Sequence, residues 1–453
     1  MSGLFKSNWR FGEAGWLLAA VLILLTTGAR AGQPSAPASY NRNSTTAHRD
    51  PPPWLPSGPL TEEQALQRAL DCDSRIASLR AAVEIAHEQR LAATDIKDPV
   101  FQAESRSSGQ SESASSDELD NSRVSVGVFV PNPWLTVPRV DARTADYQAA
   151  QADLNAAIWL VKCDVRRLFA QMGYLTNDFA FSADQVRLNG DVLSTMQARM
   201  GQGAATASDL MTASRQSIQF QDDLDQASHR YQTTRRQLAA LLDVAPESFE
   251  LATNPVAVPS LPEPGMNLQQ AEAMAVKSRW ELAALRWRAQ AAESAYHEIR
   301  NERLPWIKEV KAGYLDNAQN NSDKYWVGLA VDIPIFSWTK NHAADAVLAK
   351  ARLAGVDETN GLRLIRQELR DAMDELEQAR RQQARYDTSV SPLIATMRQT
   401  LATLKSTPNI MPDQVAAAEL QLVETLRLDL TTRWQYQLAL LNLEQTLGAP
   451  LPQ

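Results

Sequence analysis

The apolar positions along most of the chain recur every three or four residues, which is the period of helices that pack side by side over long distances. One such seam runs through the first half of the chain at Ile158, Val161, Val165, Leu168, Met172, Leu175 and Phe179. The rhythm returns in the second half at Ile365, Leu369, Ala372 and Leu376. The first seam predicts one helical region from about residue 139 to 200, which would be about 90 Å long at 1.5 Å per residue.

Each long helical region ends at a break in the pattern. The first break is Gly201-Gln202-Gly203-Ala204, and the second is Ser406-Thr407-Pro408-Asn409, with Pro412 shortly after it. A returning helix is predicted after each break, at residues 207–243 and 413–447. The last helix has two apolar faces, which is typical of a helix with neighbours on both sides, as in the wall of a tube.

The two halves of the chain have the same order of elements. Each half opens with a helix, and residues 61–80 lie beside residues 267–286 at a constant offset of 206. A proline-rich linker at residues 244–266 separates them. We therefore predict a first repeat at 60–243, a second repeat at 267–448 and a short tail at 449–453.

Two short segments in each half are predicted to be strands. Residues 124–130 and 325–334 are rich in β-branched and aromatic side chains, and residues 99–106 and 306–315 precede them as partners. Polar joints connect each pair, which gives one hairpin per half. Each strand has roughly ten residues, close to the length that a transmembrane β-strand needs.

Aromatic residues flank these strands at both ends, as they do at membrane interfaces. The helix side carries Trp134, Trp306, Phe336 and Trp338, and the hairpin side carries Tyr314, Tyr325 and Trp326. Ordinary aromatics of helix packing are the alternative interpretation.

Four strands cannot close a sheet, because membrane barrels start at about eight strands and lipid does not tolerate an open edge. Either the strands lie outside a membrane or several chains share one barrel. We predict a mainly α fold with a small β part: a duplicated long-helix coiled-coil tube with four transmembrane strands per chain, completing a 12-stranded barrel in a trimer.

The N-terminus has the pattern of a secretory signal. Lys6 and Arg10 precede an apolar run, and Ala29-Arg30-Ala31 offers small residues at both specificity positions, so residues 1–31 are predicted to be a signal peptide. An uncleaved anchor is the alternative. A proline- and serine-rich extended leader follows at 32–59, and every later apolar stretch is interrupted by charges.

Charge and composition exclude several classes of function. The net charge is −8 and no basic block stands out, which argues against a nucleic-acid partner. No histidine or cysteine motif has metal-ligand spacing, and Gly201-Gln202-Gly203 lacks the third glycine of a dinucleotide site. We therefore predict no enzyme activity, metal or cofactor. The acidic group Asp222, Asp223 and Asp225 is interpreted as a solvated helix face.

Two cysteines, Cys72 and Cys163, remain after export. An oxidising compartment permits a disulfide between them, but two small, partly buried thiols are the simpler interpretation.

The layout resembles the TolC-like outer-membrane factor family over residues 60–448. The segment 198–213, with its glycine-containing turn and Asp209-Leu210, and the closing residues 443–448 are most similar to the family. The resemblance implies a homotrimeric, passively conducting channel in the outer membrane with a periplasmic helical tunnel. Its partners would be a periplasmic adaptor and an inner-membrane transporter, in a tripartite efflux pump or a type I secretion system.

Carried over from the family, the helix breaks would form the periplasmic entrance, where the adaptor docks. The candidates are Gly201, Gln202, Gly203, Ala204, Thr407, Pro408, Asn409 and Ile410. Family members often ring this constriction with aspartates, and Asp209 and Asp413 are the gate candidates here. By position alone, each could instead be a helix N-cap.

Two other classes of function remain open at this point. One is a periplasmic coiled-coil adaptor or scaffold, although such proteins usually have one helical hairpin and a β-rich body. The other is a soluble helical enzyme or binding module. The sequence does not indicate the exported substrate or the class of pump.

Overall fold

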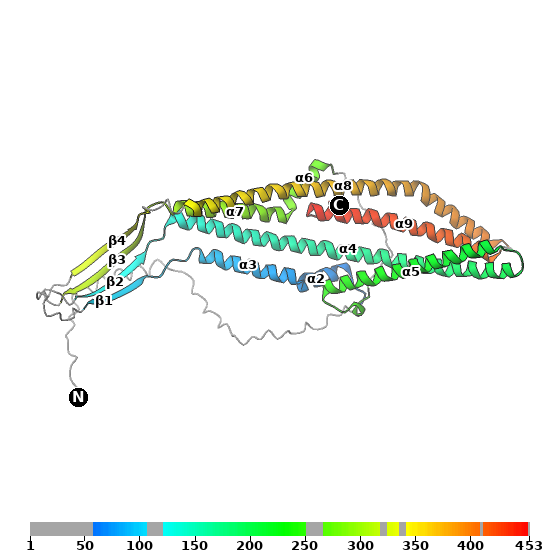
Figure 1. Cartoon of the computed structure of the whole chain (residues 1–453), viewed down its shortest axis with the longest axis horizontal. Coiled ribbons are helices and arrows are strands. Elements are labelled where there is room, and N and C mark those ends of the chain that lie inside the picture. The colour runs from blue at the N-terminus through cyan, green and yellow to red at the C-terminus, as the bar shows by residue number, and fades with distance from the viewer. Residues whose placement is uncertain are drawn as a thin grey trace, which may run out of the picture. The chain divides into compact units, whose positions relative to one another are not determined.

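A computed structural model describes residues 58–106, 121–250, 266–317, 324–334, 341–407 and 411–451 (Figure 1). The chain divides into two units, residues 1–54 and 55–453, and every described residue belongs to the second. The predicted signal peptide, most of the leader and most of the proline-rich linker lie outside the described residues.

Apart from one short 3₁₀ helix in the first half, the described parts of the two halves contain the same elements in the same order. The first half has helices α2 (Glu62–Cys72) and α3 (Ser74–Ala92), strands β1 (Val100–Arg106) and β2 (Asn121–Phe129), helices α4 (Pro133–Gly201) and α5 (Ala207–Leu242), and a short 3₁₀ helix, η1 (Pro246–Ser248). The second half has α6 (Leu268–Ser278), α7 (Trp280–Asn301), β3 (Trp306–Asn317), β4 (Lys324–Asp332), α8 (Asn341–Ser406) and α9 (Pro412–Leu447). The predicted fold class, mainly helical with a small antiparallel sheet, is confirmed.

Each half opens with two helices, whereas the periodicity predicted one. The break falls at Asp73 in the first half and at Arg279 in the second, again 206 residues apart. Asp73 accepts hydrogen bonds from the backbone N–H groups of Arg75 and Ile76, so its carboxylate starts a new helix.

Helix α4 is 69 residues long, about 100 Å at 1.5 Å per residue. It begins at Pro133, earlier than predicted, because the Asn132 side chain accepts a hydrogen bond from Trp134 N and caps it. Pro138 has no N–H to donate to the carbonyl of Trp134. The side chain of Asn301 donates to that carbonyl instead, at 2.8 Å, which keeps the helix continuous.

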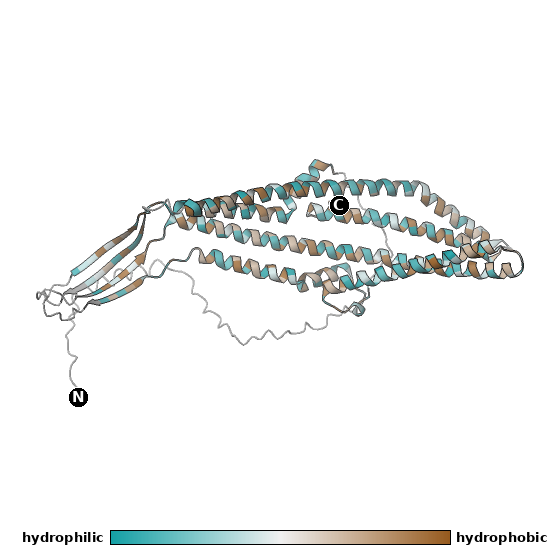
Figure 2. Cartoon of the chain, viewed as in Figure 1, coloured by the Kyte–Doolittle hydropathy of each residue, from teal (hydrophilic) through white to brown (hydrophobic). Residues whose placement is uncertain are grey.

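Helix α4 packs against partners from both halves of the chain: α3 and α5 from the first, and α7 and α9 from the second. The core lies between these helices. In the second half, Ala275, Leu282, Leu369 and Leu447 are fully or almost fully buried in one cluster. In Figure 2, hydrophobic and hydrophilic residues alternate along each long helix. Among the described helices, none combines the length and the apolar character that crossing a membrane requires.

Helix α8 contains Pro392, which has no N–H for the carbonyl of Thr388. Figure 1 shows α8 bending toward its C-terminal end, where it approaches α9. Prolines are a common cause of such bends.

The strands form one antiparallel sheet in the order β1-β2-β3-β4, so β2 and β3 join the two halves. The register places Val124 opposite Tyr314, and Tyr314 opposite Tyr325. Because side chains alternate between faces, these residues share one face with other apolar side chains. That face carries Phe101, Ala103, Val124, Val126, Val128, Val310, Ala312, Tyr314, Tyr325, Val327 and Leu329.

The opposite face of the sheet is polar and rich in glycine. By register it carries Gln102, Glu104, Arg123, Ser125, Gly127, Glu309, Lys311, Gly313, Lys324, Trp326 and Gly328, together with the apolar Val100, Phe129, Leu315 and Ala330. In the described chain, β1 and β4 each pair on one side only, so both outer edges of the sheet are open.

Candidate functional site

The first helix break forms a tight turn between α4 and α5. The backbone N–H of Gly203 donates to Met200 O at 3.0 Å, and that of Ala204 donates to Arg199 O at 2.8 Å. Gly203 has a φ of +74°, a left-handed conformation that glycine adopts without the steric cost of a Cβ. The predicted break at Gly201–Ala204 is therefore present, and Gly203 supplies its reversal.

Asp209 belongs to the cap of α5. Its backbone N–H donates to Thr206 Oγ1 at 3.2 Å, and its carboxylate accepts from Thr206 N at 3.2 Å and Thr206 Oγ1 at 2.7 Å. The Thr206 hydroxyl, followed by the Thr206 N–H, lowers the pKa of Asp209 below its ordinary value. Thr206 is the N-cap and Asp209 completes the capping box, so the structure favours a capping role for this aspartate.

Asp413 has a different environment, at the start of α9. The N-cap of α9 is Met411, which makes no side-chain capping bond, so the N-cap interpretation of Asp413 is wrong. Its carboxylate is 5 % exposed, and its Oδ2 accepts a hydrogen bond from Arg199 Nη1 at 2.6 Å. Its Oδ1 is buried and has no partner among the described residues.

Arg199 joins the two helix tips, that is, the ends of the helices at the first break (residues 201–204) and at the second break (residues 406–409). The sequence pattern did not single out this arginine. Besides Asp413, its guanidinium donates to Ala204 O in the first turn at 3.3 Å. Close by, Lys405 at the end of α8 pairs with Glu419 of α9. Thr407 ends the described part of the second break, while Pro408, Asn409 and Ile410 lie outside the described residues. The first tip is thus closed by a turn, and ion pairs hold the second tip.

A second polar cluster lies in the helical wall between α4, α5 and α9. Arg427 Nε contacts Asp178 Oδ1 at 2.6 Å, and Arg427 Nη1 contacts Gln185 Oε1 at 3.2 Å and Asp223 Oδ2 at 3.3 Å. Burial alone would lower the pKa of Arg427, but the hydrogen bond that it donates to Asp178 and the charges of the Asp178 and Asp223 carboxylates raise that pKa above its ordinary value. The interpretation of Asp223 as part of a solvated face is therefore wrong, because its charge faces Arg427.

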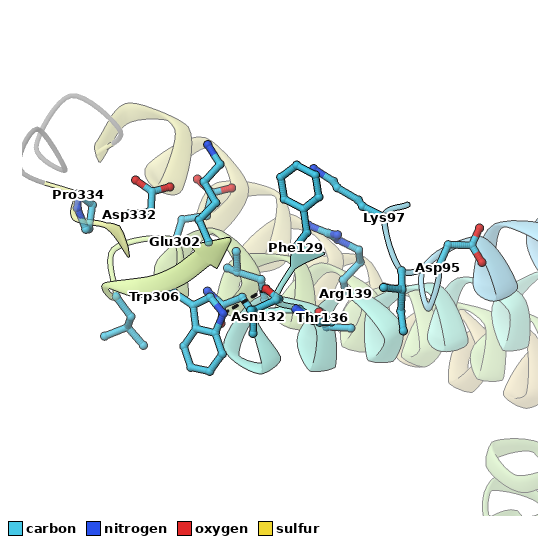
Figure 3. A pocket seen from close by; sticks show the side chains of 16 residues that line it. Asp95, Lys97, Phe129, Asn132, Thr136, Arg139, Glu302, Trp306, Asp332 and Pro334 are labelled. Carbon is cyan, nitrogen blue, oxygen red and sulfur yellow. Dashed lines mark hydrogen bonds between the residues drawn. The ribbon is translucent and has the colours of Figure 1, made fainter. Parts of the chain in front are cut away.

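The junction between helices and strands contains a cavity of about 370 Å³ (Figure 3). Its lining combines Lys97, Arg139 and Lys308 with Asp95, Glu302 and Asp332. Trp306 lines it and donates from Nε1 to Val130 O at 3.3 Å, drawn as a dashed line in Figure 3. Trp134 lies nearby at the start of α4 and is 53 % exposed. Phe336 and Trp338 lie outside the described residues.

The three aromatics of the hairpin side divide between the two faces of the sheet. Tyr314 and Tyr325 lie next to each other on the apolar face, with ring centroids 5.5 Å apart. Trp326 lies on the polar face, where the Arg123 guanidinium stands 3.9 Å above its ring. Trp326 therefore lies on the opposite face of the sheet from Tyr314 and Tyr325, because successive side chains of a strand alternate between its faces.

The two cysteines are free and lie on different helices. Cys163 is buried in α4, and burial, with the Glu444 charge second, raises the pKa of its thiol to about 11. Burial also raises the pKa of Cys72. In the described part of the chain, no group of three histidine, cysteine, aspartate or glutamate side chains could hold a metal ion.

Comparison with known proteins gives one family and a set of solved structures. Residues 65–243 match the family described as outer membrane efflux protein, which confirms the resemblance expected from the sequence. No curated protein matches the chain's sequence.

Three solved structures illustrate the shared fold. CusC is 14 % identical with a TM-score of 0.66, covering 88 % of this chain and 99 % of its own. The CmeC outer membrane channel of Campylobacter jejuni is 12 % identical with a TM-score of 0.62, covering 85 % of each chain. The open state of the MtrE outer membrane channel of Neisseria gonorrhoeae is 15 % identical with a TM-score of 0.57, covering 86 % and 89 %. At these identities the likeness shows the fold.

Proposed function

We propose, from the premise that this chain belongs to the outer membrane efflux protein family, that it is one subunit of a homotrimeric exit channel. The channel conducts passively and serves an inner-membrane transporter through a periplasmic adaptor. Such an assembly is a tripartite efflux pump or a type I secretion system.

The observation that carries the proposal is the two-faced sheet. One face exposes a continuous set of apolar side chains, including Val327 at 77 %, Leu329 at 64 % and Tyr325 at 64 %. The other face is polar, and both outer edges are open. Lipid requires an apolar surface and satisfied backbone groups, and three copies would pair every edge in one closed sheet of twelve strands.

This arrangement also orients the helices relative to the outer membrane. The sheet spans the outer membrane, and the helices extend from it into the periplasm. The two helix tips, with Gly201, Gln202, Gly203, Ala204, Thr407, Pro408, Asn409 and Ile410, form the periplasmic entrance and the adaptor contact.

The contact between Arg199 and Asp413 supports a role for Asp413 in the gate. It ties α9 of the second tip to the turn of the first, at 2.6 Å. A buried carboxylate with one unpartnered oxygen is stable only while the arginine stays in place. Separating the two tips would expose both charges to water, so an adaptor that binds the separated tips would shift the equilibrium toward them.

Two experiments test the proposal at different levels. A heat-sensitive trimer in the outer-membrane fraction, with conductance in planar bilayers, is the expected behaviour of the wild-type chain. A soluble periplasmic monomer would instead favour the adaptor or scaffold alternative and remove the channel.

The gate is tested by Asp413→Ala and Arg199→Ala, each expected to raise the single-channel conductance or the open probability. The double variant should add little to either, because both changes break one contact. Asp184→Ala is the matched control, since Asp184 pairs with Arg187 on the exposed surface of α4 at 3.3 Å. Unchanged conductance in Asp413→Ala would remove Asp413 from the constriction.

A further inference from the structure

The indole of Trp326 lies flat against the polar face of the sheet. A Cβ on Gly313 would stand 2.6 Å from Trp326 Nε1, and a Cβ on Gly328 would stand 2.9 Å from Trp326 Cζ3. No side chain larger than hydrogen fits under the ring at either position. The indole therefore packs directly on the backbone of these two glycines, which fixes its position.

Arg123 covers the outer side of the same ring. Its guanidinium carbon lies 3.9 Å from the centroid, well inside the range of a cation–π contact. Arg123 is exposed, and no described carboxylate lies within ion-pair distance of it. Its charge thus keeps a fixed place on the polar face without being neutralised by a direct partner.

On the polar face of the described strands, the level of Arg123 carries more positive than negative side chains. Glu104 lies opposite Arg123 in the register, and Lys324 begins β4 two residues before Trp326. Further along the same face, Glu309 and Lys311 pair with each other at 3.2 Å. On the polar face of the described strands, the level of Arg123 therefore carries one net positive charge per chain, while the more distant pair Glu309–Lys311 is balanced.

We propose that Arg123, held by Trp326, forms a charge filter that favours anionic over cationic solutes in the channel. The inference rests on the proposed function, since the polar face lines the interior only if the apolar face meets lipid. Three copies then place three fixed guanidinium groups around one passage. A ring of one sign of charge in a narrow passage raises the local concentration of the opposite ion.

Salt screening gives the filter a recognisable signature. The Debye length is about 10 Å at 0.1 M salt and about 3 Å at 1 M, so the preference should be strong in dilute salt and weak in concentrated salt. A change of pore width, by contrast, would alter conductance at both concentrations.

The test is the reversal potential of trimers in planar bilayers under a potassium chloride gradient. Arg123→Gln should lower the chloride-to-potassium permeability ratio by about threefold at 0.1 M mean salt, with little effect near 1 M. Arg123→Lys should stay near wild type because it keeps the charge. Trp326→Leu should give an intermediate shift, since the arginine loses the surface that fixes it.

Arg381→Gln is the control, because Arg381 is an exposed arginine on α8 that pairs only within its own helix, with Glu377. An unchanged reversal potential in conducting Arg123→Gln channels would overturn the filter, as would an equal shift in Arg381→Gln. Failure of the wild-type chain to conduct at all would instead contradict the proposed channel. Heat-sensitive trimers on gels confirm that each variant has assembled before it is measured.

Discussion

Replacing Arg427 by leucine should strongly destabilise the helical wall. The guanidinium is 22 % exposed and lies between Asp178, which is 2 % exposed, and the half-buried Asp223. Arg427→Leu would leave the Asp178 carboxylate buried between α4 and α9 without its positive partner. Breaking a buried pair from one side typically costs about 3–5 kcal/mol, and the partial exposure of Arg427 places the expected loss near 3 kcal/mol.

The double variant Arg427→Leu with Asp178→Leu separates charge from packing. With both charges gone, the desolvation penalty disappears and most of the lost stability should return. The coupling between the two positions should therefore be about 2 kcal/mol. Arg381→Leu is a matched control: its pair with Glu377 spans 2.9 Å but is 74 % and 47 % exposed. Such a surface pair is worth about 0–1 kcal/mol.

The assay is thermal unfolding of the detergent-purified protein at one fixed protein concentration, followed on gels and by circular dichroism. Fixed concentration matters because assembly contributes to apparent stability. Equal losses in Arg427→Leu and Arg381→Leu would refute the reasoning. So would a double variant whose loss equals the sum of the single variants, because that result means the two charges do not interact.

Two further outcomes follow from the C-cap of α9 and from the buried thiol of α4. Gly448 has a φ of +71°, and a Cβ there would lie 3.2 Å from the backbone of Arg279, so Gly448→Ala should cost about 1–2 kcal/mol. Gly190→Ala, in open space within α4, should be neutral or stabilising in the same melting assay. Cys163 has a pKa raised from 9.0 to about 11, so the native protein at pH 8 should alkylate there far more slowly than the denatured chain. Because the folded pKa is the higher one, the stability that Cys163 contributes is present below pH 9 and lost as pH rises toward 11. Cys163→Ala should remove that alkaline slope, and rapid labelling of the native protein would contradict the burial argument.

The sequence predicted the helices and strands well because hydrophobic period is a local property. Seam residues such as Val165, Met172 and Leu369 are fully buried. The burial predicted for the last residue of the first seam was not found, because Phe179 is 42 % exposed. The breaks at Asp73 and Arg279 were missed because a one-residue interruption barely disturbs the pattern of apolar positions on either side.

The contacts at the candidate sites were much harder to predict. Arg199 and Asp413 are 214 residues apart, and Arg427 and Asp178 are 249 apart. The spacing of residues along one helix does not indicate which side chain of a distant helix will pair with it. The contact between Trp326 and Arg123 was hard to predict for a related reason: the strand pattern shows alternation, but only the register with Gly313 reveals which side chains share the face of Trp326.

The two longest helices differ in how they respond to mechanical load. Helix α4 runs unbroken from the sheet to the first break, and the Asn301 side chain donates to the Trp134 carbonyl, which Pro138 leaves without its helical hydrogen bond. Helix α8 has its proline at position 392, near the second tip, after an otherwise regular helix. A continuous helix moves as one body along its length. A helix that lacks a backbone hydrogen bond at a proline bends more easily at that point. We therefore expect α8 to bend first near Pro392 when the second break is displaced, while α4 moves as one rigid helix.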